Sequence, residues 1–397
     1  VKRGEILMSL IMAIICVLGA LAIGEIVSIK TRAIVPSVFI TAIVFLIGYW
    51  TIFPENILEI AGFVTPIIIS SMLFLITHLG TMLSLKELIR QWKAFSIAIF
   101  GILGICFGTL VLGKLFFPWE MLVIATPPLT GGVVASIIMS EAATAKGLPE
   151  LAILAIVMYV MQGFVGYPLT ALVLRSEGNH LLKKFRKGEV IDLDKKEIKE
   201  ENIKRLIPPL PKEYQTTYIV LLKLALLVGG AILFTEAINE VISRYVICLF
   251  VGVIGAETGF IERKPLNVSG TFGFYMTSLM AFIFGGLAKA TPEMLQRLLF
   301  PFIGIIGFGV TGMLIFSFII GKILKESSPM SCAISLNALY GFPANYALTT
   351  EAAKSLGETD EEKQFLIDAM LPKMLVGGFV SVTIVSVIIA GIFVKLL

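Results

Sequence analysis

The sequence predicts an all-α polytopic membrane protein built from two inverted five-helix repeats, each with a re-entrant glycine-rich loop. Three observations predict this fold class. The 397 residues are 57% hydrophobic and only 15% charged, whereas soluble domains carry about 25% charged residues. Apolar runs long enough to cross about 30 Å of hydrocarbon recur along the chain, and one glycine-bounded motif occurs twice. The lipid bilayer is therefore expected to surround most of the surface.

The duplicated motif is the most specific signal in the chain. Residues 131–147 read GGVVASIIMSEAATAKG, and residues 341–357 read GFPANYALTTEAAKSLG. Both copies begin and end with glycine and share an EAA triplet at the same position. Each copy lies in an interrupted apolar stretch, at 119–145 and at 329–357, between uninterrupted ones. Matched breaks of this kind in the two halves of a membrane protein point to the binding site of a transporter.

Ten uninterrupted apolar segments are expected to be membrane helices, five in each half. They are 6–28, 34–52, 62–83, 95–117 and 149–174, followed by 218–238, 245–261, 268–288, 299–321 and 364–394. Because five is an odd number, the second half enters the membrane upside down relative to the first. The two interrupted stretches then approach the midplane from opposite faces, which is a geometry that permits alternating access.

The chain divides at its one long polar stretch. We expect residues 1–174 to form the first membrane repeat, 175–217 a polar cytoplasmic linker, and 218–397 the second membrane repeat. Basic residues of the short loops gather on the side of this linker when the N-terminus is placed outside, which is the orientation that the positive-inside rule favours. A short surface helix is expected in the linker around Lys195–Arg205. The expected location is the cell (plasma) membrane, with multiple passes.

Few residues suit enzyme or metal chemistry. The four cysteines lie far apart in apolar segments, and the two histidines, His78 and His180, are widely separated, so neither a disulfide framework nor a metal site is indicated. The membrane segments contain no HExxH helix or aspartate pair, so an embedded enzyme is not favoured. The net charge of +4 arises from loop residues and does not indicate nucleic acid binding. No cofactor is expected, and for His78 a structural role is favoured over proton coupling.

The two interrupted stretches hold the candidate binding residues. Pro127 and Pro128 remove main-chain donors, and the glycines that follow allow open backbone geometry, so the first stretch cannot continue as a regular helix. Main-chain N–H groups at a helix that starts after Gly132 would favour an anion. The alternative is tight helix packing through small residues with a proline kink. The candidate substrate-binding residues are Thr130, Gly131, Gly132, Ser136, Asn337, Gly341, Asn345, Thr349 and Lys373.

The polar candidates differ in how strongly they indicate a site. Serine and threonine hydroxyls in membrane helices often bond only to their own backbone. An asparagine amide is more costly to bury without a partner, so Asn337 and Asn345 are the stronger candidates. No pattern singles out ligands for a metal ion, whose ligands would be main-chain carbonyl and hydroxyl oxygens if the ion is Na⁺.

Charged residues near these stretches leave alternatives open. Lys373 either lies deep in the last segment and holds a substrate carboxylate, or lies at the inner boundary with its ammonium in water. Glu141 and Glu351 occupy matching positions in the two copies of the motif. Each lies about ten residues past its glycine, about 15 Å along a helix, so a capping or interfacial role is favoured over ion coupling.

At these residues the chain resembles the bacterial sodium/glutamate symporter family and, more distantly, the 2-hydroxycarboxylate transporters. The residues that carry the resemblance are Pro36, Thr130-Gly131-Gly132, Leu249-Phe250-Val251-Gly252-Val253, Gly341-Phe342 and Pro372. The resemblance implies inverted five-helix repeats with re-entrant loops, Na⁺-driven uptake of an anionic carboxylate, and a homodimer in which a transport core moves against a scaffold. The family usually continues its first glycine pair with His-Gly-Thr, whereas Val133, Val134 and Ala135 follow here. Glutamate itself is therefore not implied as the substrate.

These observations together predict a Na⁺-coupled symporter of a small carboxylate or amino acid, glutamate-like, that works by alternating access. The expected partners are a small anionic substrate, Na⁺ as the coupling ion and the lipid bilayer. The alternatives are a Na⁺-independent or proton-coupled carrier or exporter, or a channel, for a small anion. The exact substrate, the stoichiometry and the direction of transport have no signature in the sequence.

Overall fold

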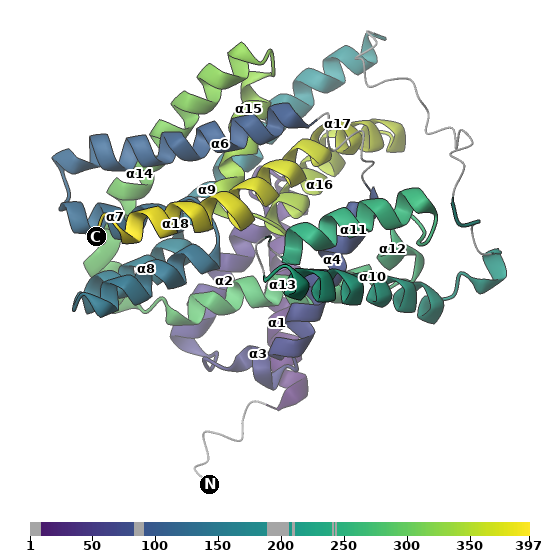
Figure 1. Cartoon of the computed structure of the whole chain (residues 1–397), viewed down its shortest axis with the longest axis horizontal. Coiled ribbons are helices and arrows are strands. Elements are labelled where there is room, and N and C mark those ends of the chain that lie inside the picture. The colour runs from purple at the N-terminus through teal and green to yellow at the C-terminus, as the bar shows by residue number, and fades with distance from the viewer. Residues whose placement is uncertain (1–8, 83–90, 189–205, 209–210, 240–241, 243) are drawn as a thin grey trace. The chain divides into compact units, whose positions relative to one another are not determined.

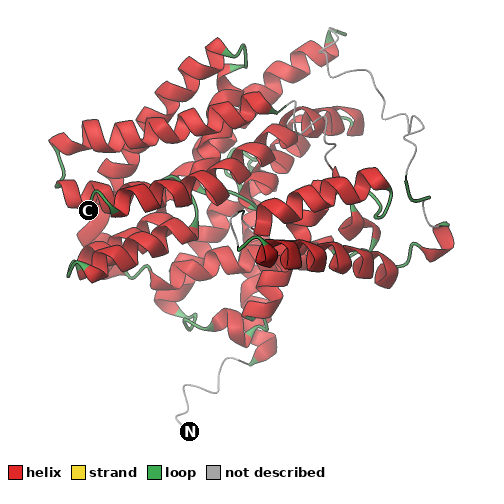
Figure 2. Ribbon diagram, viewed as in Figure 1, coloured by secondary structure: helices red, strands yellow, loops and turns green. Residues whose placement is uncertain are grey.

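The computed structural model describes residues 9–82, 91–188, 206–208, 211–239, 242 and 244–397. These residues form helices joined by short connections, and there is no β-strand among them (Figure 2). The prediction of an all-α protein is confirmed for this part of the chain. The surface helix expected around Lys195–Arg205 lies outside the described residues.

Seven helical spans among the described residues are long and apolar enough to cross a membrane. They are α1 (Leu10–Lys30), α4 (Thr65–Met82), α6 (Trp92–Phe107) with its continuation to Leu115, α9 (Pro149–Arg186), α10 (Thr217–Ala237), α14 (Pro292–Ile323), and α17 (Asp360–Phe379) continued by η6 (Val380–Val385) and α18 (Ser386–Val394). Each overlaps a predicted segment. The chain therefore has the helices of a membrane-embedded protein.

The other three predicted segments form shorter helices. They are α2 (Ser37–Thr51), α11 (Arg244–Thr258) and α13 (Phe272–Gly285), and the single turn α3 (Ile57–Ile60) follows α2. The 15 residues of α2 and of α11 rise about 22 Å, which is less than the hydrocarbon thickness of about 30 Å. In these segments the apolar stretch of the sequence is longer than the helix that it forms.

The helices form two compact units, and each unit draws on both halves of the sequence. The larger unit contains α1, α2, α6, α9, α14, α17 and α18, with four shorter helices: α7 (Trp119–Leu129), α8 (Val133–Ala145), α15 (Ser328–Leu336) and α16 (Ala344–Leu356). The smaller unit contains α4, α10, α11, α13 and the single turn α12 (Pro265–Val268). These helices are labelled in Figure 1. The predicted repeats, 1–174 and 218–397, thus each contribute helices to both units.

Within the smaller unit, α4 and α11 touch through two glycines. A Cβ atom added to Gly80 would lie 2.2 Å from the Leu249 carbonyl oxygen, and one added to Gly252 would lie 2.2 Å from that of Thr77. Small residues allow such close backbone approach between membrane helices. On the same helix α4, buried His78 accepts the main-chain N–H of Leu266 on Nδ1 at 3.3 Å. His78 thus holds the start of α12, which fits the structural role expected of it.

A second glycine contact joins α6 to α14 in the larger unit. A Cβ atom on Gly104 would lie 2.5 Å from the Gly312 carbonyl oxygen, and one on Gly312 would lie 2.1 Å from that of Gly104. One turn further on, at the start of the π-helical turn η1 (Gly108–Leu112) that continues α6, a Cβ atom on Gly108 would lie 2.1 Å from the Phe308 carbonyl oxygen. Glycine is therefore required on both helices, because any side chain here would push them apart.

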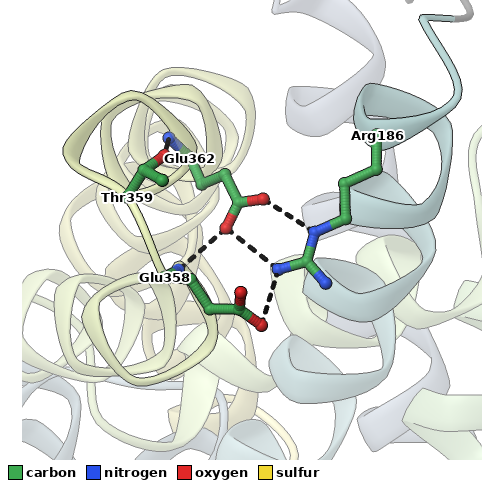
Figure 3. Close-up of polar contacts among 4 residues, drawn as sticks. All are labelled: Arg186, Glu358, Thr359 and Glu362. Carbon is green, nitrogen blue, oxygen red and sulfur yellow. Dashed lines mark hydrogen bonds and ion pairs between the residues drawn. The ribbon is translucent and has the colours of Figure 1, made fainter.

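Helix α9 is longer than the membrane segment predicted for it. Its 38 residues rise about 57 Å, and it continues through the first part of the predicted polar linker to Arg186. There it meets the start of α17: Arg186 Nε donates to Glu362 Oε1 at 2.7 Å, and Nη2 donates to Oε2 at 3.0 Å (Figure 3). Arg186 Nη2 also pairs with Glu358 Oε1 at 3.1 Å. This charged end lies beyond the predicted membrane segments 149–174 and 364–394.

Candidate functional site

The first copy of the motif starts at a helix break between α7 and α8. Helix α7 ends at Leu129, directly after its two prolines, and Thr130 caps it. Gly131 and Gly132 then have φ angles of 110° and 91°, a region in which a residue with a Cβ atom is strained. The glycine pair therefore fixes the break, and α8 begins at the next residue, Val133.

The second copy of the motif also starts at a helix break. Helix α15 ends at Leu336 and tightens into the turn η5 (Asn337–Leu339). Gly341 follows with a φ angle of 66°, and its N–H donates to the Asn337 carbonyl at 2.8 Å, which closes the end of the helix as glycine caps do. Helix α16 starts at Ala344 and has 13 residues, as α8 has. Both breaks lie where the sequence predicts them.

The two breaks touch each other. A Cβ atom on Gly131 would lie 2.8 Å from the Ala338 carbonyl oxygen of the second break. The same atom would lie 3.1 Å from Val382 Cγ2, and a Cβ atom on Gly341 would lie 2.7 Å from that methyl group. Val382 belongs to η6, the π-helical turn between α17 and α18, and such turns within helices are frequent at functional sites. No pattern in the sequence indicates Val382.

Asn337 and Asn345 are both fully buried and both reach Met374 on α17. Asn345 Nδ2 donates to the Met374 carbonyl at 3.1 Å. Asn337 Nδ2 donates to the Ile334 carbonyl at 3.0 Å and contacts Met374 Sδ at 3.5 Å. Gly378 makes room for this pair, because a Cβ atom there would lie 2.4 Å from Asn345 Nδ2. The two predicted asparagines are therefore brought together beside the second break.

The oxygen atoms of these two asparagines differ. Asn345 Oδ1 accepts the N–H of Tyr346 at 2.7 Å. Asn337 Oδ1 is buried and has no hydrogen-bond partner in the described part of the chain. An uncompensated buried acceptor is costly, so this oxygen is suited to receive a donor or a small cation.

The predicted hydroxyl groups lie near the breaks but mostly bond within their own segments. Thr130 Oγ1 donates to the Pro127 carbonyl at 2.7 Å, and Thr349 Oγ1 donates to the Asn345 carbonyl at 2.7 Å. These are the local backbone bonds that threonine often forms, and they leave lone pairs rather than the proton for other contacts. Ser136 is buried in the first turn of α8.

Lys373 is turned toward a different part of the unit. Its Nζ donates to Glu326 Oε1 at 2.6 Å, and the side chains are 28% and 14% exposed. Glu326 lies in the connection that follows α14, outside the apolar span that ends at Ile323. The ammonium is thus paired at the end of a span, and it is not grouped with the asparagines or the glycine breaks.

Helix α9 supplies polar residues that belong to none of the motifs in the sequence. Thr170 Oγ1 lies 2.7 Å from the Tyr340 hydroxyl, and the rings of Tyr167 and Tyr340 lie 5.5 Å apart. Gln162 is fully buried, and neither its oxygen nor its nitrogen has a partner among the residues that the structure describes. The feature of the sequence that could have indicated Gln162 is that it is a single amide side chain in an apolar segment.

Electrostatic character at the breaks comes from the backbone. The starts of α8 and α16 each carry a partial positive charge of about half an elementary charge. The sequence has no charged side chain in 121–140, 151–174, 328–350 or 374–394, and the described residues contain no group of three or more His, Cys, Asp or Glu that could hold a metal ion. An anion at the breaks would be held by N–H groups, and a cation by neutral oxygens.

No protein-family model and no curated protein sequence matches this chain. The function is therefore inferred from the geometry of the two breaks and the residues around them.

Proposed function

We propose that the protein is a Na⁺-coupled symporter of a small carboxylate or amino acid in the cell membrane. One observation carries the proposal: two copies of one motif each break a helix, and the two breaks touch where Gly131 lies against Ala338. Broken helices in matching positions of two halves are typical of the binding sites of secondary transporters. Close packing alone would not require a repeated break with matched 13-residue helices after it.

In this proposal the two halves are inverted repeats and the two breaks are re-entrant. The N–H groups at the start of α8 bind the carboxylate of the substrate, because this helix end carries positive partial charge. At the start of α16 the N–H groups of Asn345 and Tyr346 already donate to the Gly341 carbonyl and to Asn345 Oδ1. Asn337 Oδ1, together with main-chain carbonyls at the breaks, offers oxygen ligands for Na⁺. Bound Na⁺ would then lower the cost of placing the anion between apolar helices, which couples the two binding events.

The two compact units suit a transporter in which one part moves. The larger unit contains both breaks and both asparagines, so it would be the transport core, and the smaller unit with α4 and α10–α13 would belong to the scaffold. A homodimer joined through its scaffolds is the assembly that we propose.

The test is uptake into proteoliposomes that contain the purified protein. A panel of radiolabelled amino acids, dicarboxylates and hydroxycarboxylates is supplied with an inward Na⁺ gradient, and parallel vesicles receive K⁺ instead. We expect concentrative, saturable uptake of one substrate class only with Na⁺. Uptake that follows a proton gradient, or flux that does not saturate and ignores Na⁺, would instead identify the proton-coupled carrier or the channel.

A further inference from the structure

The side chain of Gln162 is the most unusual polar group in the larger unit. It is 0% exposed, and both atoms of its amide lack hydrogen-bond partners in the described part of the chain. It also lies at the centre of the predicted membrane segment 149–174. A buried amide at that depth is destabilising unless something satisfies it. Because neither the amide oxygen nor the amide nitrogen has a partner, rotating the amide by 180° would still leave both atoms without a hydrogen bond.

Gln162 lies on the face of α9 that packs against the second break. One turn after it, Gly166 would place a Cβ atom 2.8 Å from Leu339 Cβ and 2.8 Å from the Tyr340 ring. One turn before it, Met158 belongs to the buried apolar cluster that contains Leu339. Residues four apart share one face of a helix, so Gln162 lies on the same buried face of α9 as Gly166, which contacts the second break.

This segment is also where the two breaks meet. Ala338, whose carbonyl lies against Gly131, is the neighbour of Leu339. Gln162 is therefore about one helical turn, or about 5.4 Å, from the place on α9 that faces the junction of the breaks.

We propose that Gln162 selects the substrate by binding two groups of it at once, a carboxylate oxygen and a hydrogen-bond donor on the adjacent carbon. This inference rests on the proposed transport function and narrows its substrate class. The amide nitrogen donates to the carboxylate, and the amide oxygen accepts from the donor. This pattern is shared by α-amino acids and α-hydroxy acids, whereas a carboxylate without such a donor leaves the amide oxygen unpaired.

The absence of charged side chains around the junction strengthens this assignment. Segments 121–140, 151–174 and 328–350 contain no aspartate or glutamate, so an ammonium or hydroxyl group bound there needs a neutral oxygen acceptor. The unpaired oxygen of Gln162 is such an acceptor. Sites built to hydrogen-bond a donor reject analogues that lack it much more strongly than apolar pockets reject a change of size.

The test compares matched ligands on the purified full-length protein in Na⁺-containing detergent solution. The probes are L-glutamate, 2-hydroxyglutarate and glutarate, and a second series of L-alanine, lactate and propionate. We expect the wild type to bind the amino or hydroxy member of one series at least about tenfold more tightly than its donor-free member. Comparing the amino acid with the hydroxy acid in each series shows whether the donor that Gln162 binds is an ammonium or a hydroxyl group.

The variant Q162M removes both hydrogen-bonding groups at similar volume, and M161L on the same helix is its matched control. We expect Q162M to lose the preference for the donor-bearing ligand and to bind it about tenfold more weakly or worse. Its melting temperature without ligand should equal or exceed that of the wild type, because an unpaired buried group is removed. M161L should keep the preference.

Three results would overturn the inference. The first is that Q162M keeps the preference for the donor-bearing ligand. The second is a lower melting temperature of ligand-free Q162M, because this would show that the amide has a structural partner. The third is tighter binding of the donor-free ligand by the wild type. Na⁺-dependent uptake of that donor-free ligand would support the proposed transport function but contradict the role of Gln162 in substrate selection. If no compound of the uptake panel is transported, both the proposed transport function and the role of Gln162 are contradicted.

Discussion

Glu351 caps a helix from which it is more than three hundred residues distant in sequence: its Oε2 atom accepts the main-chain N–H of Ser37 at 3.1 Å. Ser37 is the first residue of α2, and Pro36 before it offers no side-chain acceptor. The Ser37 hydroxyl also bonds this carboxylate, and the Ser28 hydroxyl donates to it at 3.0 Å. A negative charge at a helix N-terminus is stabilising, so Glu351 ties α16 to the connection between α1 and α2.

This contact predicts that Glu351→Gln destabilises the protein. The amide keeps the size of the side chain but loses the negative charge and one acceptor oxygen, so the free energy of unfolding should fall by about 1–3 kcal/mol. The fall would be measured as a lower melting temperature in detergent. Glu141→Gln is the matched control, because Glu141 occupies the equivalent position in the first copy of the motif and is exposed. That change should stay within about 0.5 kcal/mol.

The same pair of variants tests the alternative role in ion coupling. If Glu351 bound the coupling ion, Glu351→Gln would abolish the Na⁺ dependence of transport while the melting temperature stayed unchanged. That combination would contradict the capping role.

A second prediction concerns the glycine contact between α6 and α14. Gly312→Ala would place a methyl group 2.1 Å from the Gly104 carbonyl oxygen, so the helices must separate, at a cost of about 1–3 kcal/mol. Gly307→Ala on the same helix is the control, because a Cβ atom there meets nothing within 4 Å. It should be neutral or stabilising by up to about 1 kcal/mol, since alanine is the better helix former. Equal melting temperatures for the two variants would contradict the close contact.

A third prediction concerns the ion pair between Lys373 and Glu326. Lys373→Gln removes the partner of a carboxylate that is only 14% exposed and should lower stability by about 1–3 kcal/mol. The double variant Lys373→Gln, Glu326→Gln should recover part of this loss, because it leaves no unpaired charge. Thermal melting of both single variants and the double variant measures the coupling. The substrate affinity of the double variant tests whether Lys373 binds the substrate carboxylate. Unchanged affinity would exclude this role.

The two helix breaks could be predicted from the sequence because they depend on local backbone geometry. Gly131, Gly132 and Gly341 adopt φ angles that other residues rarely adopt, so their chemistry alone fixes where a helix stops. The distance of Glu351 along its helix from Gly341 predicts a capping or interfacial role. Its partner could not be predicted, because Ser37 approaches it only through the folding of distant helices.

Other features depend on packing that the sequence does not encode locally. Hydropathy predicts an apolar segment that ends at 174, whereas the arginine, lysine and leucine residues that follow are good helix formers and continue the helix to Arg186. The division into two units was not predicted, because repeats in sequence do not reveal which helices pack together. Gln162 was missed because a single amide in an apolar helix has no periodic pattern.

A fourth prediction concerns the charged junction between α9 and α17, which lies outside the predicted membrane segments. Hydrogen bonds from Arg186, and then from the main-chain N–H of Glu358, lower the pKa of Glu362 from 4.5 to about 2. Glu362 also completes the cap of α17, where Thr359 Oγ1 accepts the N–H of Glu362 at 3.2 Å (Figure 3). Because the folded pKa is the lower one, the charged carboxylate stabilises the fold above pH 4.5, and this contribution is lost as the pH falls toward 2.

Glu362→Gln should therefore lower the melting temperature at pH 7 by about 2–4 °C. The effect is moderate because Glu362 is buried but its partner Arg186 is half-exposed. The difference from the wild type should shrink as the pH falls from 4.5 toward 2, because the wild-type carboxylate then becomes neutral as well. Glu361→Gln is the matched control, since it removes the same charge from the same exposed turn of α17 without touching Arg186. Melting curves of the three proteins in detergent across this pH range measure the effect, and a difference that stays constant down to pH 2 would show that Glu362 stabilises the junction without its charge.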